Sequence, residues 1–303
     1  AALFGLEALP DHDVRYERAE ETVEAVKALW EGWEEDALVA DQRTGRFADT
    51  SKIHPVSYRG RHVTVEGVLN VPRSPQGRPV ILQAGGSPQG VALAARHADA
   101  VFTVNHTLEA AKDFAGRVRS LAARHGRRPE EILILPGLFP VLGSTEKEAR
   151  ERKDWLDELA GEEEELVGLA ATIGLDPADL KLDAELPWEK VEAVSSFGGS
   201  QGFRAAVLEL ARRERLTVRQ LLKRNPSGHR SVVGTPEQVA DTIEEWFSAG
   251  AADGFNLNAD FFPDGLELTV EHLIPELQRR GLFRREYESA TLRGNLGLPI
   301  PGR

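Results

Sequence analysis

The 303-residue sequence contains no cysteine, which excludes disulfide bonds, thiolate metal sites and cysteine nucleophiles. It has no apolar run near the roughly 18 residues that a membrane span needs, and no signal-peptide pattern. Basic residues are outnumbered as well, since 37 lysines and arginines against 49 aspartates and glutamates give a net charge of −12. We therefore expect no nucleic-acid or membrane surface, both of which need clustered basic residues. These absences predict an acidic, cytoplasmic globular protein.

Methionine is absent as well, and the chain begins Ala1-Ala2-Leu3 rather than where a gene would begin. We therefore expect a processed chain or part of a longer one. The length allows two domains, but α/β barrels of this size form one, and we take residues 1–303 as a single domain.

Strand and helix patterns alternate from residue 79 onward. Apolar strands are predicted at 79–84, 100–104, 132–139 and 254–258, and helices at 88–98, 108–125, from Thr235 to near Gly250, and at 266–280. Apolar strands between helices are typical of a parallel sheet buried on both faces. Four such units after an isolated helix at 13–33 resemble the second half of a (β/α)₈ barrel, with a doubly wound sheet as the alternative.

Two segments interrupt this alternation. Residues 38–77 are rich in Asp, Gly, Pro and Arg, and we read them as an excursion that carries a short hairpin near 62–65. Residues 145–232 read as a mostly helical insertion with a glycine-rich patch at Phe197-Gly198-Gly199. The glutamate run at 162–165 is interpreted as a solvated helix face rather than a metal site.

The first candidate site follows the strand at 79–84, as Gln83-Ala84-Gly85-Gly86-Ser87. Small residues let the backbone approach a ligand, and the N-terminus of the next helix offers unpaired N–H groups. This pattern suits a phosphate, with the Ser87 hydroxyl as a donor, although an ordinary tight turn has the same composition. No Walker lysine follows, so an NTPase is not indicated.

His12 and Tyr16 stand four residues apart at the start of the first helix and so share one face. Both side chains reach a ligand if that end of the helix borders a site. The alternative is a boundary histidine beside a half-buried core tyrosine.

Phe102 and Val104 alternate along a strand and point the same way, as pocket wall or as barrel core. His106 follows the carboxyl end of that strand, where it is either catalytic or simply solvated. His229 and Arg230 precede the capped helix at Thr235, in a loop that would hold an anionic substrate or lie on the surface. His229, like His106, is a candidate catalytic residue.

Other chemistries have no signal in the sequence. The remaining histidines form no i,i+4 pair or carboxylate constellation that supports a metal site: His54, His62, His97, His125 and His272. No G-x-S-x-G elbow appears, so serine hydrolase chemistry is not indicated.

Taken together, six segments resemble the nitrilotriacetate monooxygenase component A and dibenzothiophene sulfone monooxygenase group of the bacterial-luciferase-like flavin monooxygenases. The resemblance covers essentially the whole chain, and the order of the segments makes it specific. They are His12-Asp13-Val14-Arg15-Tyr16 and the residues to 19, the segment 69–79 (Leu69 to Pro79), Gln83-Ala84-Gly85-Gly86-Ser87, the segment 233–241 with Thr235-Pro236-Glu237-Gln238, Asp253-Gly254-Phe255-Asn256, and the segment 275–283 that ends Gly281-Leu282-Phe283.

The resemblance implies a TIM barrel with insertions that binds reduced FMN (FMNH₂). A separate NAD(P)H:flavin reductase would deliver the cofactor, and O₂ would oxygenate a small organic substrate through a (hydro)peroxyflavin. By position, His12 and Tyr16 would contact FMN, with Ala84, Gly85, Gly86 and Ser87 around the phosphate. Phe102 and Val104 would form substrate wall beside the flavin. Many relatives carry a second hydroxyl residue where this chain has Gly86, so one phosphate contact would come from backbone alone.

Members of this group begin with about four further βα units, each of roughly 30 or more residues, so this chain would carry the C-terminal half of the barrel. Two other readings stay open. One is a luciferase-like oxidoreductase that uses a deazaflavin, and the other is a non-catalytic flavin-binding or scaffold fragment. We also expect a homo-oligomer. The sequence does not define the substrate.

Overall fold

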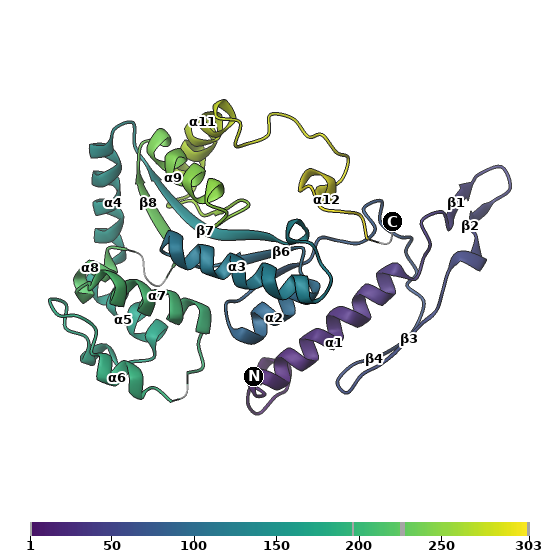
Figure 1. Cartoon of the computed structure of the whole chain (residues 1–303), viewed down its shortest axis with the longest axis horizontal. Coiled ribbons are helices and arrows are strands. Elements are labelled where there is room, and N and C mark those ends of the chain that lie inside the picture. The colour runs from purple at the N-terminus through teal and green to yellow at the C-terminus, as the bar shows by residue number, and fades with distance from the viewer. Residues whose placement is uncertain (1, 196, 225–227, 302–303) are drawn as a thin grey trace.

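The computed structural model describes residues 2–195, 197–224 and 228–301. Its centre is a parallel five-stranded sheet in which β5, β6, β7 and β8 are neighbours in that order, with β9 also paired to β7 (Figure 1). The strands are β5 (Leu82–Ala84), β6 (Ala100–Thr103), β7 (Leu133–Leu142), β8 (Arg230–Gly234) and β9 (Asn256–Leu257). The four predicted strands are therefore confirmed.

Strand β7 is ten residues long and serves three partners. Leu133 to Pro136 pair with β6, Gly137 and Leu138 pair with β9, and Leu138 to Leu142 pair with β8. Strand β8 was not predicted, and the end of the expected helical insertion at 145–232 is wrong because residues 230–232 are strand. These residues are identifiable as strand only through their pairing with the distant β7.

Helices α2 (Pro88–His97) and α3 (Leu108–Arg124) cover one face of β6 and the start of β7. Ser87 and Thr107 cap these helices through their side-chain oxygens, which accept hydrogen bonds from the backbone N–H of Gly90 and Ala110. The core between helices and sheet is made of small and branched side chains, among them Val91, Ala94, Val101, Phe114, Val118 and Ile134. Both helices were predicted to within one residue.

A second helical layer packs on the other half of β7. It consists of α9 (Pro236–Ser248), α10 (Asp264–Leu268), a π-helical turn (Thr269–Leu273) and α11 (Ile274–Arg279), which share a core with Leu138 and Leu142. The predicted capping box at α9 is present, since the Thr235 and Gln238 side chains each bond the other's backbone N–H.

One face of the edge strand β5 is open at Leu82. Val101 and Ile134 point into the α2–α3 core, whereas Leu82, on the opposite face of the edge strand β5, is 54% exposed. A doubly wound sheet buries both faces of every strand, so the exposure of Leu82 argues against that alternative.

The helices between residue 161 and β8 form a bundle of their own. α4 (Glu146–Ala160) packs along β7 and β8, and Gly161, with a positive φ of 81°, turns the chain into α5 (Glu162–Ile173). The bundle continues through α6 (Trp188–Ala193), α7 (Gln201–Glu214) and α8 (Val218–Leu222). Its buried cluster draws only on residues 169–222 (Figure 1). We call residues 162–222 the helical insertion.

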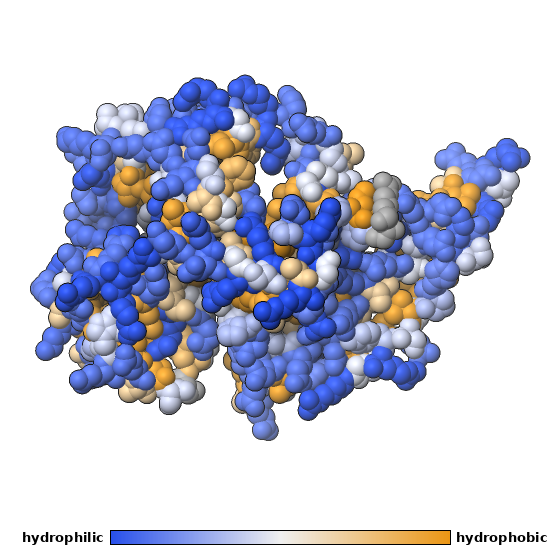
Figure 2. All heavy atoms as spheres, in the orientation of Figure 1, coloured by the Kyte–Doolittle hydropathy of each residue, from blue (hydrophilic) through white to orange (hydrophobic). Residues whose placement is uncertain are grey.

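The N-terminal part combines helix α1 (His12–Glu31) with two antiparallel hairpins, β1–β2 (Leu38–Asp41, Arg46–Ala48) and β3–β4 (Val56–Arg59, Thr64–Gly67). The Glu21 carboxylate on α1 accepts the backbone N–H groups of the β3–β4 turn, residues 61–63. The sequence indicated only the second hairpin. The first projects from the body with hydrophobic atoms at its surface (Figures 1 and 2), including Phe47 at 61% exposure.

The C-terminal segment after α11 returns to the sheet through α12 (Leu292–Asn295). The guanidinium of Arg293 is fully buried and donates to both carboxylate oxygens of Asp99, at 2.9 and 2.7 Å. Asp99 also accepts the backbone N–H of Ile81, so this ion pair fixes the start of β5. Among the described residues, none of the helices has the length and hydropathy needed to cross a bilayer.

We expect Arg293→Met to lower the free energy of unfolding by about 3–5 kcal/mol, because the Asp99 carboxylate is then left buried without its partner. Urea unfolding followed by circular dichroism measures this change. Arg284→Met, which removes an exposed arginine of the same segment, is the control and changes stability little. Adding Asp99→Asn to Arg293→Met should recover part of the loss. Equal losses of stability in Arg293→Met and Arg284→Met would contradict a stabilising role of the buried Arg293–Asp99 ion pair.

Candidate functional site

The loop that follows β5 brings together the first group of predicted residues. Gly85 has a positive φ of 145°, and Ser87, only 6% exposed, begins α2 as its N-cap. The Ser87 Oγ lies 3.4 Å from the Tyr16 hydroxyl, although the two residues are 71 positions apart. The carboxyl end of β5 therefore meets the start of α1 at a helix N-terminus, which favours an anionic ligand.

Glycines make room for Tyr16 at this loop. A Cβ at Gly90 would lie 2.9 Å from the Tyr16 hydroxyl, and one at Gly85 would lie 3.4 Å from it. The His12 ring centroid is 4.8 Å from that of Tyr16, so the predicted shared face is present. His12 and Ser87 also line one pocket of about 550 Å³.

The second group meets one strand further along the sheet. Ala84 on β5 is paired with Phe102 on β6, and the Phe102 ring lies 4.8 Å from the ring of His229. Phe203, from α7 of the helical insertion, approaches His229 from another side at 5.3 Å. His229 thus lies between the sheet and the insertion, and burial lowers its pKa, so the imidazole is neutral at pH 7.

Gly137 in β7 is what allows this arrangement. A Cβ there would lie 2.3 Å from the Cγ and Nδ1 atoms of His229, so the imidazole rests directly on the strand backbone. Gly137 and Phe203 were not among the residues predicted from the sequence. A glycine inside an apolar strand is a known sign of close approach, and it was the available signal for Gly137.

His106 is buried beneath the insertion, with 4% exposure. Burial lowers its pKa to about 4, and the nearby charge of Arg224 acts in the same direction. Its Nε2 has no hydrogen-bond partner among the described residues. The solvated-loop alternative is therefore wrong for His106. Its imidazole is neutral, and His229 and Arg230 are close enough to lower its pKa further.

Arg230 does not lie in a loop but begins β8. Its guanidinium lies 4.7 Å from the ring centroid of Trp246, on the helix α9 side of the strand. Burial lowers its pKa to about 10, and Arg224 adds to this effect. The structure thus places Arg230 against a buried tryptophan, while its neighbour His229 points to Phe102.

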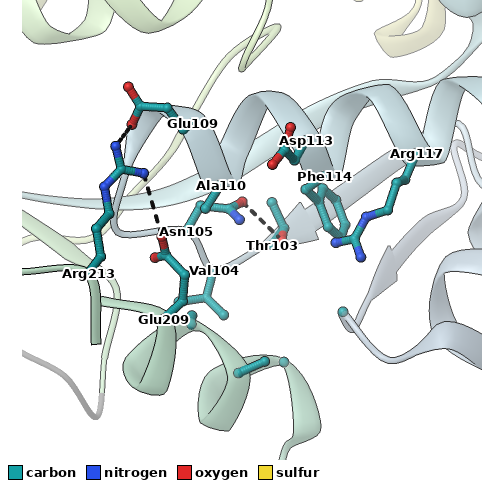
Figure 3. Close-up of a pocket in the computed structure, with 14 residues that line it drawn as sticks. Thr103, Val104, Asn105, Glu109, Ala110, Asp113, Phe114, Arg117, Glu209 and Arg213 are labelled. Atoms are coloured by element: carbon teal, nitrogen blue, oxygen red, sulfur yellow. Dashed lines mark hydrogen bonds and ion pairs between the residues drawn. The ribbon is translucent and has the colours of Figure 1, made fainter. Parts of the chain in front are cut away.

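Val104 and Gly86 line a further pocket of about 490 Å³ between α3 and α7 (Figure 3). Arg213 of α7 forms ion pairs across it with Glu109 of α3, at 2.9 Å, and within its own helix with Glu209, at 3.7 Å. The insertion therefore closes one side of the carboxyl end of β6.

One carboxylate constellation escaped the sequence analysis. His97 lies with Glu20 and Glu24 of α1, and their ligand atoms are within 4.8 Å of one another. The prediction that His97 has no carboxylate neighbours is wrong. The two glutamates lie more than 70 positions before His97, so spacing along the sequence did not reveal them. These ligand atoms already have partners in the chain, since Arg96 pairs with Glu20, the Tyr58 hydroxyl donates to Glu24 at 2.8 Å, and Lys27 Nζ is 3.2 Å from His97 Nδ1.

A family model described as luciferase-like monooxygenase matches residues 1–253. The chain belongs to this family. Two curated relatives are each 43% identical: N-acetyl-S-(2-succino)cysteine monooxygenase of Bacillus subtilis (strain 168), over 96% of this chain, and nitrilotriacetate monooxygenase component A of Aminobacter aminovorans, over 98%. The chain spans 66% of each, about two thirds of their length.

The structure of a riboflavin lyase, solved with modified FMN and riboflavin, superposes with a TM-score of 0.80 at 31% identity. The match covers 99% of this chain and 65% of that one. The predicted luciferase-like TIM-barrel fold and the resemblance to the nitrilotriacetate monooxygenase group are therefore confirmed.

The buried His106 predicts a pH dependence of stability. In the unfolded chain a histidine has a pKa near 6.5, so below that pH the unfolded state binds a proton that the folded state, with a pKa of about 4, does not. Stability contributed by His106 is thus present above pH 6.5 and lost as the pH falls toward 4. Between pH 7 and pH 5 the loss should be about 2 kcal/mol.

Urea unfolding of the native chain and of His106→Gln at pH 7 and pH 5 measures this contribution. The variant should lose about 2 kcal/mol less over that interval. His125→Gln, at an exposed position, is the control and should follow the native chain. A His106→Gln profile parallel to the native one would show that this imidazole is not held neutral by burial.

Proposed function

We propose that this protein is the oxygenase of a two-component system, which uses reduced FMN and O₂ to oxygenate a small organic substrate. The observation that carries the proposal is the meeting of the Tyr16 hydroxyl and Ser87 Oγ at the N-terminus of α2. Membership of the luciferase-like monooxygenase family and the fold shared with an FMN-containing structure support it.

The residues at this loop fit a phosphate ester. Ser87 and Tyr16 are both hydrogen-bond donors, and the start of α2 adds the positive end of a helix dipole. Gly85 and Gly90 keep the approach free of Cβ atoms. In this proposal Ala84, Gly85, Gly86 and Ser87 hold the phosphate, while His12 and Tyr16 contact it from α1.

Reduced FMN, when bound, would supply the chemistry that activates O₂. The chain's residues would hold the substrate beside the flavin and exclude water. Phe102 and Val104 provide apolar surface at the carboxyl end of β6, and the neutral ring of His229 continues it. His106 is a buried neutral imidazole that follows the carboxyl end of β6, near His229.

A separate NAD(P)H:flavin reductase is the proposed protein partner. The relative named component A is, by that name, one part of a system with more than one component. The relatives named above differ in substrate, and pocket shape decides such differences, so the proposal extends to a small organic compound and no further.

Anaerobic titration of the protein with reduced FMN, followed by flavin absorbance or fluorescence, tests the cofactor assignment. We expect saturable binding that Ser87→Ala and Tyr16→Phe each weaken about 5- to 10-fold, because each removes one hydrogen bond to a charged group. Ser57→Ala and Tyr287→Phe, at exposed positions away from the loop, are matched controls and should bind as the native chain does.

Unchanged binding by Ser87→Ala and Tyr16→Phe would contradict the phosphate assignment. Tighter binding of a reduced deazaflavin, with hydride transfer in place of O₂ consumption, would favour the deazaflavin oxidoreductase instead. Flavin binding with no O₂-dependent product for any substrate, when a reductase supplies reduced FMN, would favour the non-catalytic reading.

A further inference from the structure

Helices α2 and α3 border a groove whose charged side chains are mostly basic. The groove has a volume of about 780 Å³, and Lys112, Arg117 and Arg124 line it against one carboxylate, that of Asp113. In the part of the chain that the structure describes, none of these three basic side chains forms an ion pair, although Arg117 lies 5.9 Å from the Phe114 ring centroid. We call this surface the α3 groove. Its excess of positive charge is local, because the whole chain has a net charge of −12.

Two further features of the α3 groove define what would fit it. Carboxylates are available to this helix elsewhere, since Arg119 donates to both oxygens of Asp253, at 2.9 and 2.8 Å. The apolar side chains of Val91 and Leu121 also line the groove. The surface that fits it therefore carries carboxylates beside apolar side chains.

Helix α4 presents this combination. Trp155 and Leu159 stand one turn apart and are 44% and 62% exposed, and Asp154 and Glu158 stand beside them with the same spacing. We call these four residues the α4 ridge. Neither of its carboxylates forms an ion pair with the described residues. The basic residues of α4 have other partners, in the ion pairs Lys147–Glu151, Arg150–Glu146, Arg152–Asp260 and Lys153–Asp157.

The apolar part of the α4 ridge extends beyond the helix. The Phe261 ring lies 5.8 Å from the Trp155 ring, and Phe262 is 68% exposed. A single exposed apolar side chain is common on protein surfaces, whereas several together mark an interaction site. Tryptophan in particular is enriched among the residues that dominate binding energies.

We propose that the α4 ridge of one copy of this protein binds in the α3 groove of a second copy. The apolar residues of the ridge lie against Val91 and Leu121 in this contact, and its two carboxylates face the basic side chains of the groove. Laying one apolar helix face into a groove is a common mode of recognition. A second copy is the partner because both complementary surfaces, each with its charges unpaired, lie on one chain. The proposal gives the expected homo-oligomer a definite interface and does not depend on the proposed function.

Charge reversal tests the contact, with self-association measured by analytical ultracentrifugation of the full chain. The ridge-reversed variant carries Asp154→Lys and Glu158→Lys, and the groove-reversed variant carries Lys112→Glu and Arg117→Glu. We expect the native chain to self-associate at low salt. Each variant alone should do so at least about tenfold more weakly, because like charges then face each other across the contact. Added salt should weaken the native association as well.

A mixture of the two variants gives the most specific result. The unchanged ridge of the groove-reversed variant fits the unchanged groove of the ridge-reversed variant, and the two reversed surfaces fit each other. We therefore expect the mixture to associate about as tightly as the native chain, although neither variant does so alone. General repulsion does not explain such a recovery, because the two reversals cancel in the summed net charge of the mixed pair.

Matched controls carry the same charge changes at exposed positions outside both surfaces. Glu286→Lys with Glu288→Lys corresponds to the ridge reversal, and Arg18→Glu with Arg43→Glu corresponds to the groove reversal. Both control variants should associate as the native chain does. Circular dichroism shows whether each variant keeps its fold.

A neutral substitution tests the groove without any change of charge. Gly116 lines the α3 groove, and no atom lies within 4 Å of the position of a Cβ there. Gly116→Leu therefore fits the folded chain but fills part of the groove, and we expect it to weaken self-association. Ala123→Leu, at an exposed position of the same helix outside the groove lining, is the control and should leave self-association unchanged.

Three results would overturn the proposal. The first is a native chain that stays monomeric at low salt up to about 0.1 mM protein. The second is self-association that the ridge-reversed and groove-reversed variants both retain. The third is a loss of association in each variant that their mixture does not restore, because the two surfaces would then bind something other than each other.

Discussion

Strand β7 has to pair with three other strands over ten residues, and the arrangement of the site depends on this constraint. Because β6 pairs with its first part and β8 with its second part, the end of β6 and the start of β8 meet at Gly137. This is where Phe102 and His229 come into ring contact. Without the long strand, the residues before β8 would have no fixed place relative to β6.

The helical insertion is attached to the sheet by comparatively little. Its core is its own, and its polar links to α3 are the Arg213–Glu109 ion pair and the 3.4 Å contact of Thr107 with Glu209. Exposed ion pairs of this kind contribute only about 0–1 kcal/mol. The Phe203–His229 contact and the Gly86–Gly202 approach add packing rather than strong bonds. A ligand between the two parts would therefore have a large influence on their relative position.

Local chemistry made much of the fold predictable. Ser87, Thr107 and Thr235 each begin a helix that the sequence indicated, because a side-chain oxygen at an N-cap acts within three residues. The loop at Ser87 and the pair His12–Tyr16 were also identified, from spacing and from the family resemblance. Their meeting at 3.4 Å depends on α1 packing against α2, which no pattern within either segment specifies.

The features that were missed depend on partners far apart in the chain. Strand β8 is defined by β7, about 90 residues earlier, and the cluster of Glu20, Glu24 and His97 joins two helices. The burial of Arg293 follows from an aspartate 194 residues before it. Arginine is rarely buried unless it is paired, and one sequence does not reveal the pair.

Arg293 also affects the order in which parts of the chain can fold during synthesis. The ribosome makes Asp99 long before Arg293, and until Arg293 has emerged the carboxylate lacks this partner in the interior. The edge of the sheet at β5 is therefore fixed only after residue 293 has been made. The helical insertion, whose core closes within residues 169–222, can settle while the rest is still being made.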